Sequence, residues 1–414
     1  FFEEKIHSIR RVYPDPAQIN LAAEKLKKSK KPIIISGGGV LYSEAEEEIS
    51  NFAKKHNIPV TATVMGIGCM NKDDPYYISA IGCLGEGSSN NLSRETDLVL
   101  AVGTKLSDFS TGSWTNFQNE DFQLVSLNTS RFDTTKHRAT PVVSDAKVGL
   151  QELSNALGDW KAPDDWYNKA VHEKKTWDSY VSKESGPTNQ ELPSYAHAVG
   201  AVYRNADPSD IVVTAAGGLV GEVVQIWKPK QLNTFETEWG FSCMGYEISG
   251  ALGIKMAKPD QDVIVFVGDG SYLLQNSDIY SSVIYNKKLI IVVCDNGGHM
   301  VINRLQLAKG GKEYLCNLRS ARASNVQFVD FEAHAKSMGA NGETVKTTSE
   351  LEAAFKRAKE SDKTYVISML THGYEWLEGS AFWESPTLEV HSTDGNKKAY
   401  EEFIEGKNKQ RKGV

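Results

Sequence analysis

The sequence predicts an α/β protein with two doubly wound domains, each built on a parallel sheet. Short apolar runs rich in β-branched residues recur along the chain, as in strands that are buried on both faces. They alternate with segments that carry apolar residues at helical spacing. The alternation occurs twice, on either side of a polar stretch at residues 158–192. Alternating strands and helices favour parallel sheets covered by helices on both faces.

The first domain is expected over residues 1–157. Pro14-Asp15-Pro16 predicts a turn and a helix start. Ser43 is followed three residues later by Glu46, which predicts a capping box for a helix over 44–56. Strands are expected at 32–36, 60–64, 97–102, 123–128 and 141–144, and a closing helix at 147–157. Residues 158–192 are expected to be a linker that is partly helical.

The second domain is expected over residues 193–371. Its strands are predicted at 211–214, 234–237, 263–267, 289–294, 343–346 and 364–370. A helix made largely of small residues, at 244–257, can pack closely on this sheet. Residues 372–414 form a C-terminal tail rich in aromatic and charged residues, and its final basic run is expected to be solvated.

Composition narrows the class of protein. The chain of 414 residues is 40% hydrophobic and 24% charged, which is typical of a globular protein, and its length suggests two or three domains. Its net charge is −7 and it has no long basic stripe, so nucleic acid is not an expected partner. It has no apolar run long enough to span a bilayer and no secretory signal, so no membrane association is expected. Five scattered cysteines without a CxxC pair favour the cytoplasm and argue against a zinc site or a disulfide framework.

Two predicted strands end in small and oxygen-bearing residues. Gly268-Asp269-Gly270-Ser271 follows the run at 263–267, and Asp295-Asn296-Gly297-Gly298 follows the run at 289–294. In an open parallel sheet, ligands bind beyond the carboxyl ends of the strands. A carboxylate, an amide oxygen and free carbonyls suit a hard cation such as Mg²⁺, and glycine amides near a helix start suit a phosphate.

A glycine run in the first domain, Ser36-Gly37-Gly38-Gly39, invites comparison with a dinucleotide-binding loop. It is not GxGxxG, however, and no acidic residue ends a strand about twenty residues later. A tight turn between strand and helix is the preferred interpretation.

The paired strand ends resemble the signature of the thiamine diphosphate fold, with Asp269 and Asn296 lying 27 positions apart. Residues 14–157 resemble the central domain, and 193–371 the diphosphate-binding domain, of the acetolactate-synthase-like superfamily. Several stretches resemble one member family, the 3D-(3,5/4)-trihydroxycyclohexane-1,2-dione hydrolases of myo-inositol catabolism. These stretches are NTFETEWGFSCMGYEISGALG at 233–253, AVGTKLSDFSTGSWT at 101–115, VINRLQ at 301–306 and the aromatic tail around Tyr374, Trp376 and Trp383.

This resemblance implies a role for each candidate site residue. Asp269, the Asn296 side chain and the Gly298 carbonyl would coordinate Mg²⁺ on the diphosphate. The remaining residues would contact thiamine diphosphate, and they are Ala216, Gly217, Gly218, Ser242, Met244, Gly268, Gly270 and Ser271. Met244 would hold the cofactor in its bent conformation, and the Ser242 carbonyl would accept a hydrogen bond from its aminopyrimidine. Leu219 replaces a hydrogen-bond donor that relatives often carry there.

The catalytic groups are less defined. In the family, a glutamate on a further N-terminal domain activates the cofactor, and the site forms between subunits of a tetramer. No acidic residue here has a matching context, so we expect that residues 1–414 do not catalyse alone. His299, which follows the metal turn, is a candidate for proton transfer, with simple packing over the cofactor as the equal alternative.

The leading interpretation is a thiamine diphosphate-dependent hydrolase that cleaves a C–C bond of a small cyclic 1,2-dione and yields 5-deoxy-glucuronate. One alternative is an acetolactate-synthase-like carboligase or decarboxylase acting on 2-oxo acids. Another is a non-catalytic fragment that keeps a vestigial cofactor pocket.

Overall fold

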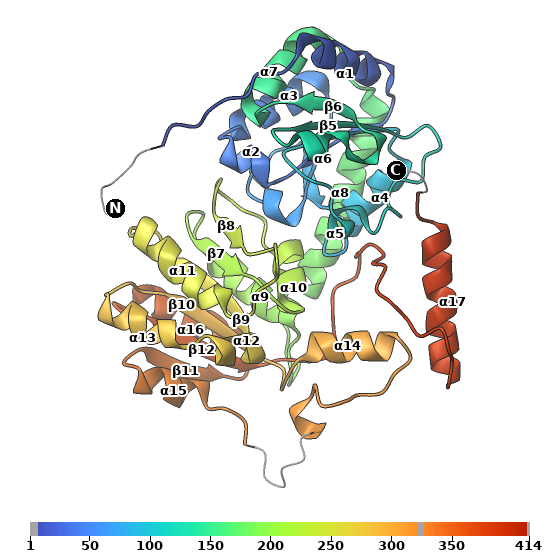
Figure 1. Ribbon diagram of the computed structural model, residues 1–414. Helices are drawn as coiled ribbons and strands as arrows, with labels where there is room; N and C mark the ends of the chain where they lie inside the picture. The colour runs from blue at the N-terminus through green and yellow to red at the C-terminus, as the bar shows by residue number, and fades with distance from the viewer. Residues whose placement is uncertain (1–6, 321–326, 412–414) are drawn as a thin grey trace.

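The computed structural model describes residues 7–320 and 327–411, and within these ranges the chain forms two six-stranded sheets. Every pairing between neighbouring strands is parallel. One sheet with its helices lies above the other in Figure 1. The predicted α/β class with two parallel sheets is confirmed.

The first sheet has the strand order β3-β2-β1-β4-β5-β6. Its strands are β1 (Pro32–Ser36), β2 (Val60–Ala62), β3 (Tyr77–Ala80), β4 (Leu98–Val102), β5 (Gln123–Asn128) and β6 (Thr140–Val143). The helices of this half are α1 (Pro16–Lys28), α2 (Gly38–Tyr42), α3 (Glu46–His56), α4 (Gly87–Glu95), α5 (Asp108–Thr111), α6 (Arg131–Thr135) and α7 (Ala146–Leu157). Alternate β1 side chains enter two different cores, since Ile34 packs with α1, α3 and α7 whereas Ile33 and Ile35 pack with Leu92 of α4.

Two predictions about helix starts have different outcomes. Asp15 caps α1 by accepting a hydrogen bond from the Ala17 amide at 2.8 Å, and Pro16 is its first residue, as predicted. The capping box at Ser43 is wrong, because α3 begins after Ala45 without a side-chain cap. Residues 38–42 already form a helical turn, and Ser43 ends that turn by donating its amide hydrogen bond to the Gly39 carbonyl.

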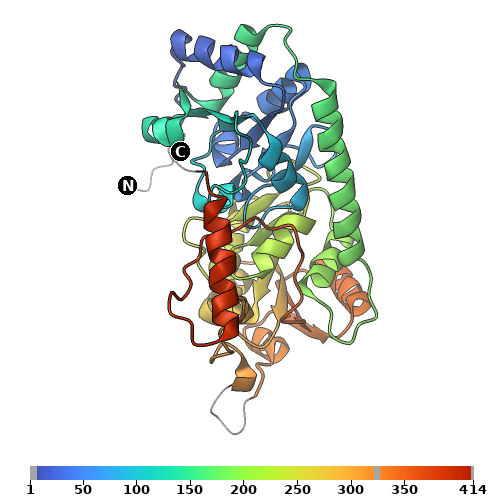
Figure 2. The same cartoon turned by 90° about the vertical axis from the view of Figure 1, so that its right-hand side faces the viewer.

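Residues 158–192 contain the long helix α8 (Asp164–Glu184). Its first turn is fixed to the first sheet by Trp166, which is 3% exposed and donates its indole N–H to the Pro32 carbonyl at 2.9 Å. Val181 near its other end joins the apolar cluster that contains Ala198 and Val199 of the second half. Figure 2 shows α8 running along one side of the molecule beside both halves.

The second sheet has the order β11-β12-β10-β9-β7-β8. Its strands are β7 (Ile211–Thr214), β8 (Phe235–Thr237), β9 (Val263–Gly268), β10 (Ile290–Asp295), β11 (Asn341–Val345) and β12 (Tyr365–Leu370). One face is covered by α9 (Tyr195–Asn205), α10 (Leu219–Ile226) and α16 (Thr348–Glu360), and the other by α11 (Tyr246–Ala257), α13 (Ser277–Ile284) and α15 (Phe331–Ser337). The short helices α12 (Asp269–Leu274) and α14 (Met300–Ala308) follow β9 and β10.

The C-terminal tail returns from β12 to the first half. The Asn90 side chain donates to the Gly379 carbonyl at 2.8 Å, and the Ala381 amide donates to the Gly82 carbonyl at 3.1 Å. The final helix α17 (Asp394–Asn408) lies along the outside in Figures 1 and 2. The tail therefore ties the two halves together. Within the described ranges, no helix combines the length and apolar character needed to cross a membrane.

We expect Trp166→Ala to lower the free energy of unfolding by about 3–5 kcal/mol, because it removes a buried ring and its hydrogen bond to Pro32. Urea denaturation measures the change. Tyr42→Ala, at a side chain that is 77% exposed, is the matched control and should change stability little. Equal losses in the two variants would contradict the anchoring role of Trp166.

Candidate cofactor and metal site

The candidate site residues lie in four short segments near the carboxyl ends of β7, β8, β9 and β10. These segments are residues 215–218 after β7, 242–245 in the loop between β8 and α11, 268–271 where β9 meets α12, and 296–299 after β10. From β7 the chain proceeds in one direction to β8 and in the other to β9 and β10. The gap between β7 and β9 is therefore the topological switch point of this sheet, where doubly wound proteins bind ligands.

Asp269 is the first residue of α12 and is 6% exposed. Burial, reinforced by the negative charge of Asp295, raises the pKa of the Asp269 carboxyl to about 7, although backbone hydrogen bonds from Asn296 and Gly298 oppose this shift. The two strand ends thus hold two acidic side chains close together in a poorly solvated position. A cation bound there would stabilise both charges.

The side chain of Asn296 is fixed by Tyr195, the first residue of α9. Its amide nitrogen donates to the Tyr195 hydroxyl at 2.6 Å. Its amide oxygen is buried and has no hydrogen-bond partner among the described residues. A buried acceptor without a partner is costly unless a ligand satisfies it. The orientation set by Tyr195 leaves this oxygen available beside Asp269, which is an arrangement that fits a bound cation.

The oxygen-rich donor set agrees with a hard cation. Within residues 7–320 and 327–411, no cluster of three or more His, Cys, Asp or Glu side chains could hold a metal ion. A cation here would therefore depend on amide and carbonyl oxygens in addition to Asp269. Mg²⁺, which is bound in proteins by few carboxylates and completes its shell with ligand oxygens and water, suits such a site.

Gly270, Met244 and His299 meet at the first turn of α12. A Cβ atom added to Gly270 would lie 2.8 Å from His299 Cε1 and 3.4 Å from Met244 Cε. His299 is held by its amide, which donates to the Cys316 carbonyl at 2.7 Å. Met244 is 38% exposed and lies in the turn before α11 rather than in the helix itself. The structure thus brings these three predicted residues together, and the close approach of His299 requires glycine at position 270.

Glu247 joins two of the turns. Its carboxylate oxygens accept hydrogen bonds from the amides of Ala216, at 3.2 Å, and Gly245, at 2.8 Å. It is 1% exposed, and burial raises its pKa while hydrogen bonds from the backbone and from Ser271 oppose the shift. The Ala216 amide is therefore already used. Gly217, with a φ of +78° and no described atom within 4 Å of an added Cβ, presents the open part of this turn.

Ser242 lies in an exposed loop with a left-handed φ of +53°. Its hydroxyl donates to the Ala215 carbonyl at 3.3 Å, which connects the loop to the turn after β7. Glu238 orders the same loop by accepting the amides of Phe241, at 2.8 Å, and Cys243, at 2.6 Å. Leu219, which follows the Gly217-Gly218 turn, is buried in the core and offers no polar group.

The tail contributes Trp376 to the edge of the site. A Cβ added to Gly218 would lie 2.0 Å from the Trp376 ring, so the ring packs directly on that turn. Trp376 also contacts Tyr195 edge to face, with centroids 5.6 Å apart. The neighbouring Leu377 amide donates to Glu222 at 3.1 Å. Burial raises the pKa of the Glu222 carboxyl to about 7, against the opposing effects of this hydrogen bond and of the Arg304 charge.

The corresponding switch point of the first sheet is closed. It lies between β1 and β4. The Gly39 amide donates to the Gly103 carbonyl at 2.9 Å, and a Cβ added to Gly37 would lie 2.4 Å from that same oxygen. Backbone fills the crevice, which supports the tight-turn interpretation of the glycine run and disfavours a dinucleotide there.

Sequence reasoning missed Tyr195 and Glu247 as parts of the site. Glu247 carries a local signal, because it is an acidic residue in a helix made largely of small and apolar residues. Tyr195 carries none, since it lies 101 positions from Asn296 and has the sequence context of an ordinary helix start.

Comparison with known proteins agrees with this geometry. Residues 19–153 match the family described as "Thiamine pyrophosphate enzyme, central domain", and residues 215–369 match "Thiamine pyrophosphate enzyme, C-terminal TPP binding domain". A protein of Halalkalibacterium halodurans named 3D-(3,5/4)-trihydroxycyclohexane-1,2-dione hydrolase is 34% identical, over 97% of this chain and 67% of that protein. Proteins of the same name from Bacillus licheniformis and Lacticaseibacillus casei are 32% and 31% identical, over 97% and 98% of this chain and 66% and 67% of theirs. The chain thus spans about two thirds of the length of these relatives.

We expect stability to depend on pH through Glu222. Its pKa rises from 4.5 to about 7 on folding, so it takes up a proton, and its contribution to the free energy of unfolding falls as pH increases between these values. Glu222→Gln keeps an acceptor for Leu377 and removes the titration. Relative to the unmodified chain, the variant should gain up to about 3 kcal/mol between pH 5 and pH 8 in urea denaturation. Glu24→Gln, at an exposed side chain, is the control. If Glu222→Gln differs in stability from the unmodified chain by the same amount at pH 5 and at pH 8, the raised pKa of Glu222 is contradicted.

Proposed function

The chain belongs to the thiamine pyrophosphate enzymes and, within them, to the family of 3D-(3,5/4)-trihydroxycyclohexane-1,2-dione hydrolases, and we propose that it forms the cofactor-binding part of such a hydrolase. The substrate is a small cyclic 1,2-dione, and its cleavage to 5-deoxy-glucuronate belongs to the breakdown of myo-inositol. The observation that carries the proposal is the buried Asn296 amide oxygen at the carboxyl end of the second sheet, which has no partner among the described residues, on a residue whose backbone hydrogen-bonds Asp269.

In this proposal, Mg²⁺ is held by the Asp269 carboxylate, the Asn296 amide oxygen and the Gly298 carbonyl. The raised pKa of Asp269, caused by burial and by the charge of Asp295, supports a cation at this position. The hydrogen bond from Asn296 to Tyr195 at 2.6 Å fixes which atom of the amide faces the cation. A cation held by these groups would attract the phosphate oxygens of the cofactor, so these residues would also determine where the diphosphate lies.

The diphosphate is proposed to lie between two turns. Gly268, Gly270 and Ser271 contact it from the start of α12, where amide groups are free to donate. Gly217 and Gly218 contact it from the turn after β7, and Ala216 supports that turn through Glu247. Glu247 fixes the turn after β7 against the loop before α11, because it accepts hydrogen bonds from the amides of Ala216 and Gly245.

The remaining predicted residues act on the organic part of the cofactor. Met244, whose Cε lies close to Gly270, supports the bent conformation. The Ser242 carbonyl accepts a hydrogen bond from the aminopyrimidine. His299 is exposed and next to the same backbone, so it is placed to hold or move a proton.

When bound, thiamine diphosphate supplies a nucleophilic carbon and an electron sink for breaking a bond beside a carbonyl group. The balance of the reaction is hydrolytic. The bond between the two carbonyl carbons breaks. One carbon gains the hydroxyl of water and becomes a carboxylic acid, which releases its proton at neutral pH, and the other gains the hydrogen of water and becomes an aldehyde. The residues described above orient the reactants and exclude water from the buried Asp269 side of the site.

We propose that the activating glutamate lies outside residues 1–414, in a further domain, so these residues alone do not turn over substrate. We also propose that the intact protein is a homo-oligomer, a tetramer, in which the site forms at a contact between subunits. Exposed apolar side chains on α12, on α13 and at the residue after α13 support a covering partner domain there, and they are Leu273, Leu274, Tyr280, Ile284 and Tyr285. A cytoplasmic location is proposed because all five cysteines are free.

We expect the chain to bind thiamine diphosphate only with Mg²⁺, and we expect Asp269→Asn to weaken this binding at least tenfold, because a charged ligand of the cation is lost. Isothermal titration calorimetry measures both effects. Exposed Asp260→Asn should bind as the unmodified chain does. Absence of binding by the unmodified chain, or unchanged binding by Asp269→Asn, would refute the proposed site and would favour the vestigial-pocket alternative.

The competing function is a carboligase or decarboxylase that acts on 2-oxo acids. Product analysis distinguishes the hydrolase from this competing function, and it requires a longer form of the protein that includes the proposed activating domain. We expect an open-chain acid from the cyclic dione and no product from pyruvate. Acetolactate or acetaldehyde from pyruvate would support the competing function instead.

A further inference from the structure

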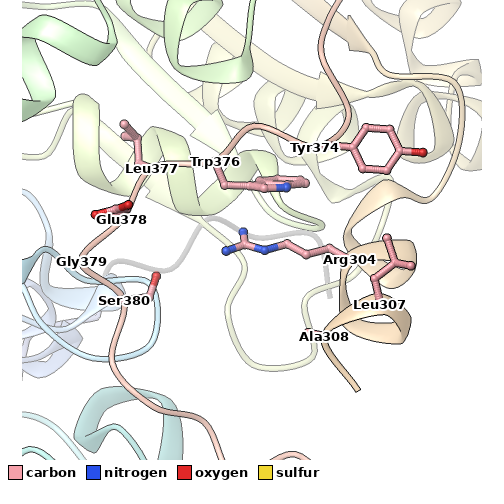
Figure 3. Close-up of a pocket in the computed structure, with 9 residues that line it drawn as sticks. All are labelled: Arg304, Leu307, Ala308, Tyr374, Trp376, Leu377, Glu378, Gly379 and Ser380. Carbon is pink, nitrogen blue, oxygen red and sulfur yellow. The ribbon is translucent and has the colours of Figure 1, made fainter. Parts of the chain in front are cut away.

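A pocket of about 530 Å³ lies next to the candidate site, between α14 and residues 374–380 of the tail. Figure 3 shows Arg304, Leu307 and Ala308 on the α14 side and the tail on the other. Trp376 lines this pocket and also packs on Gly218 and Tyr195. One aromatic ring is therefore shared by the pocket and the candidate cofactor site.

Arg304 is the cationic group of this pocket. Its guanidinium lies 4.9 Å from the centroid of the Trp376 ring, and Figure 3 shows it extended beneath that ring. Within the described part of the chain it makes no hydrogen bond or ion pair, and the charge that acts on it is that of the buried Glu222 carboxyl. Stacking on an aromatic face holds the plane of a guanidinium and leaves its N–H groups available to a ligand.

The pocket wall is held in place by contacts that use the backbone of the tail. The Leu377 amide donates to Glu222 at 3.1 Å, the Glu378 amide to the Tyr180 hydroxyl at 3.0 Å, and the Gly379 carbonyl accepts from Asn90 at 2.8 Å. These contacts come from both halves of the molecule.

On the α14 side, Glu313 accepts hydrogen bonds from the Tyr374 hydroxyl and from the Asn303 amide nitrogen, the latter at 2.9 Å. Asn303 adjoins Arg304 and is fully buried. The helix turn that carries Arg304 is therefore connected to the tail across the pocket.

We propose that this pocket binds the open-chain hydroxy acid formed by the reaction, with Arg304 pairing with its carboxylate. This inference rests on the proposed function, because hydrolysis of a cyclic dione converts an uncharged ring into a chain with one carboxylate. A guanidinium binds a carboxylate through two parallel hydrogen bonds. Glu378 and Ser380 line the same pocket and accept hydrogen bonds from hydroxyl groups of the chain. Arg304 is thus a residue that distinguishes the charged product from the uncharged substrate.

Calorimetric titration of the 414-residue chain with sodium gluconate tests the proposal, since gluconate is an open-chain hydroxy acid of six carbons. Sorbitol, which has the same chain without the carboxylate, is the ligand control. We expect gluconate to bind at least about tenfold more tightly than sorbitol, and Arg304→Gln to abolish that difference. Arg304→Lys keeps the charge without the planar fork and should fall between the two. Exposed Arg131→Gln is the protein control and should bind as the unmodified chain does.

Equal binding of gluconate by the unmodified chain and by Arg304→Gln would overturn the inference, as would absence of gluconate binding by the unmodified chain. Titration of the same samples with thiamine diphosphate and Mg²⁺ separates this failure from failure of the proposed function. Gluconate binding that depends on Arg304 in a chain that does not bind the cofactor would uphold the pocket and contradict only the cofactor site. Thermal unfolding of each variant verifies that it is folded.

Discussion

The parallel pairing of β9 with β10 is the constraint on which the candidate site depends. In this register Cys294 lies opposite Gly268, so both strands end at the same level. Asp269 and Asp295 consequently lie close together in a buried position. Burial raises the pKa of both carboxyls, and the charge of Asp295 raises that of Asp269 further. The Asn296 backbone hydrogen-bonds the Asp269 carboxyl, and the hydrogen bond from the Asn296 side chain to Tyr195 leaves its amide oxygen without a partner among the residues that the structure describes. A bound cation would relieve the repulsion between the two carboxylates and would also satisfy the Asn296 amide oxygen.

The two sheets show how the same topology can be open or closed to ligands. In the first sheet, Gly39 and Gly103 hydrogen-bond across the switch point, and no side chain separates the backbones. In the second sheet, Glu247 lies between the turns, and its two carboxylate oxygens hold the turn after β7 and the loop before α11 apart. A buried carboxylate costs stability, and hydrogen bonds from both sides compensate for it. The C-terminal tail adds Trp376 to the edge of the candidate site, where its ring packs on Gly218. The site is therefore complete only when the tail is in place.

Local sequence signals predicted the parts of the structure that depend on neighbouring residues. The buried strands at Pro32–Ser36 and Leu98–Val102 were predictable from continuous apolar runs. The turns that contain Asp269 and Asn296 were predictable from the small residues that follow such runs. The capping box at Ser43 failed because a preceding helical turn already used that residue. The packing of α8 through Trp166, the role of Tyr195 and the position of Trp376 depend on contacts between residues more than a hundred positions apart. Such contacts leave no pattern in the sequence near either partner.

A crystal structure of the chain with thiamine diphosphate and Mg²⁺ tests the central claim most directly, because that claim concerns which oxygen atoms bind the cation. The account predicts a Mg²⁺ ion at about 2.1 Å from the Asp269 carboxylate and from the Asn296 amide oxygen, with diphosphate oxygens completing its shell. A cofactor bound elsewhere, or bound with the Asn296 oxygen still without a partner, would contradict it.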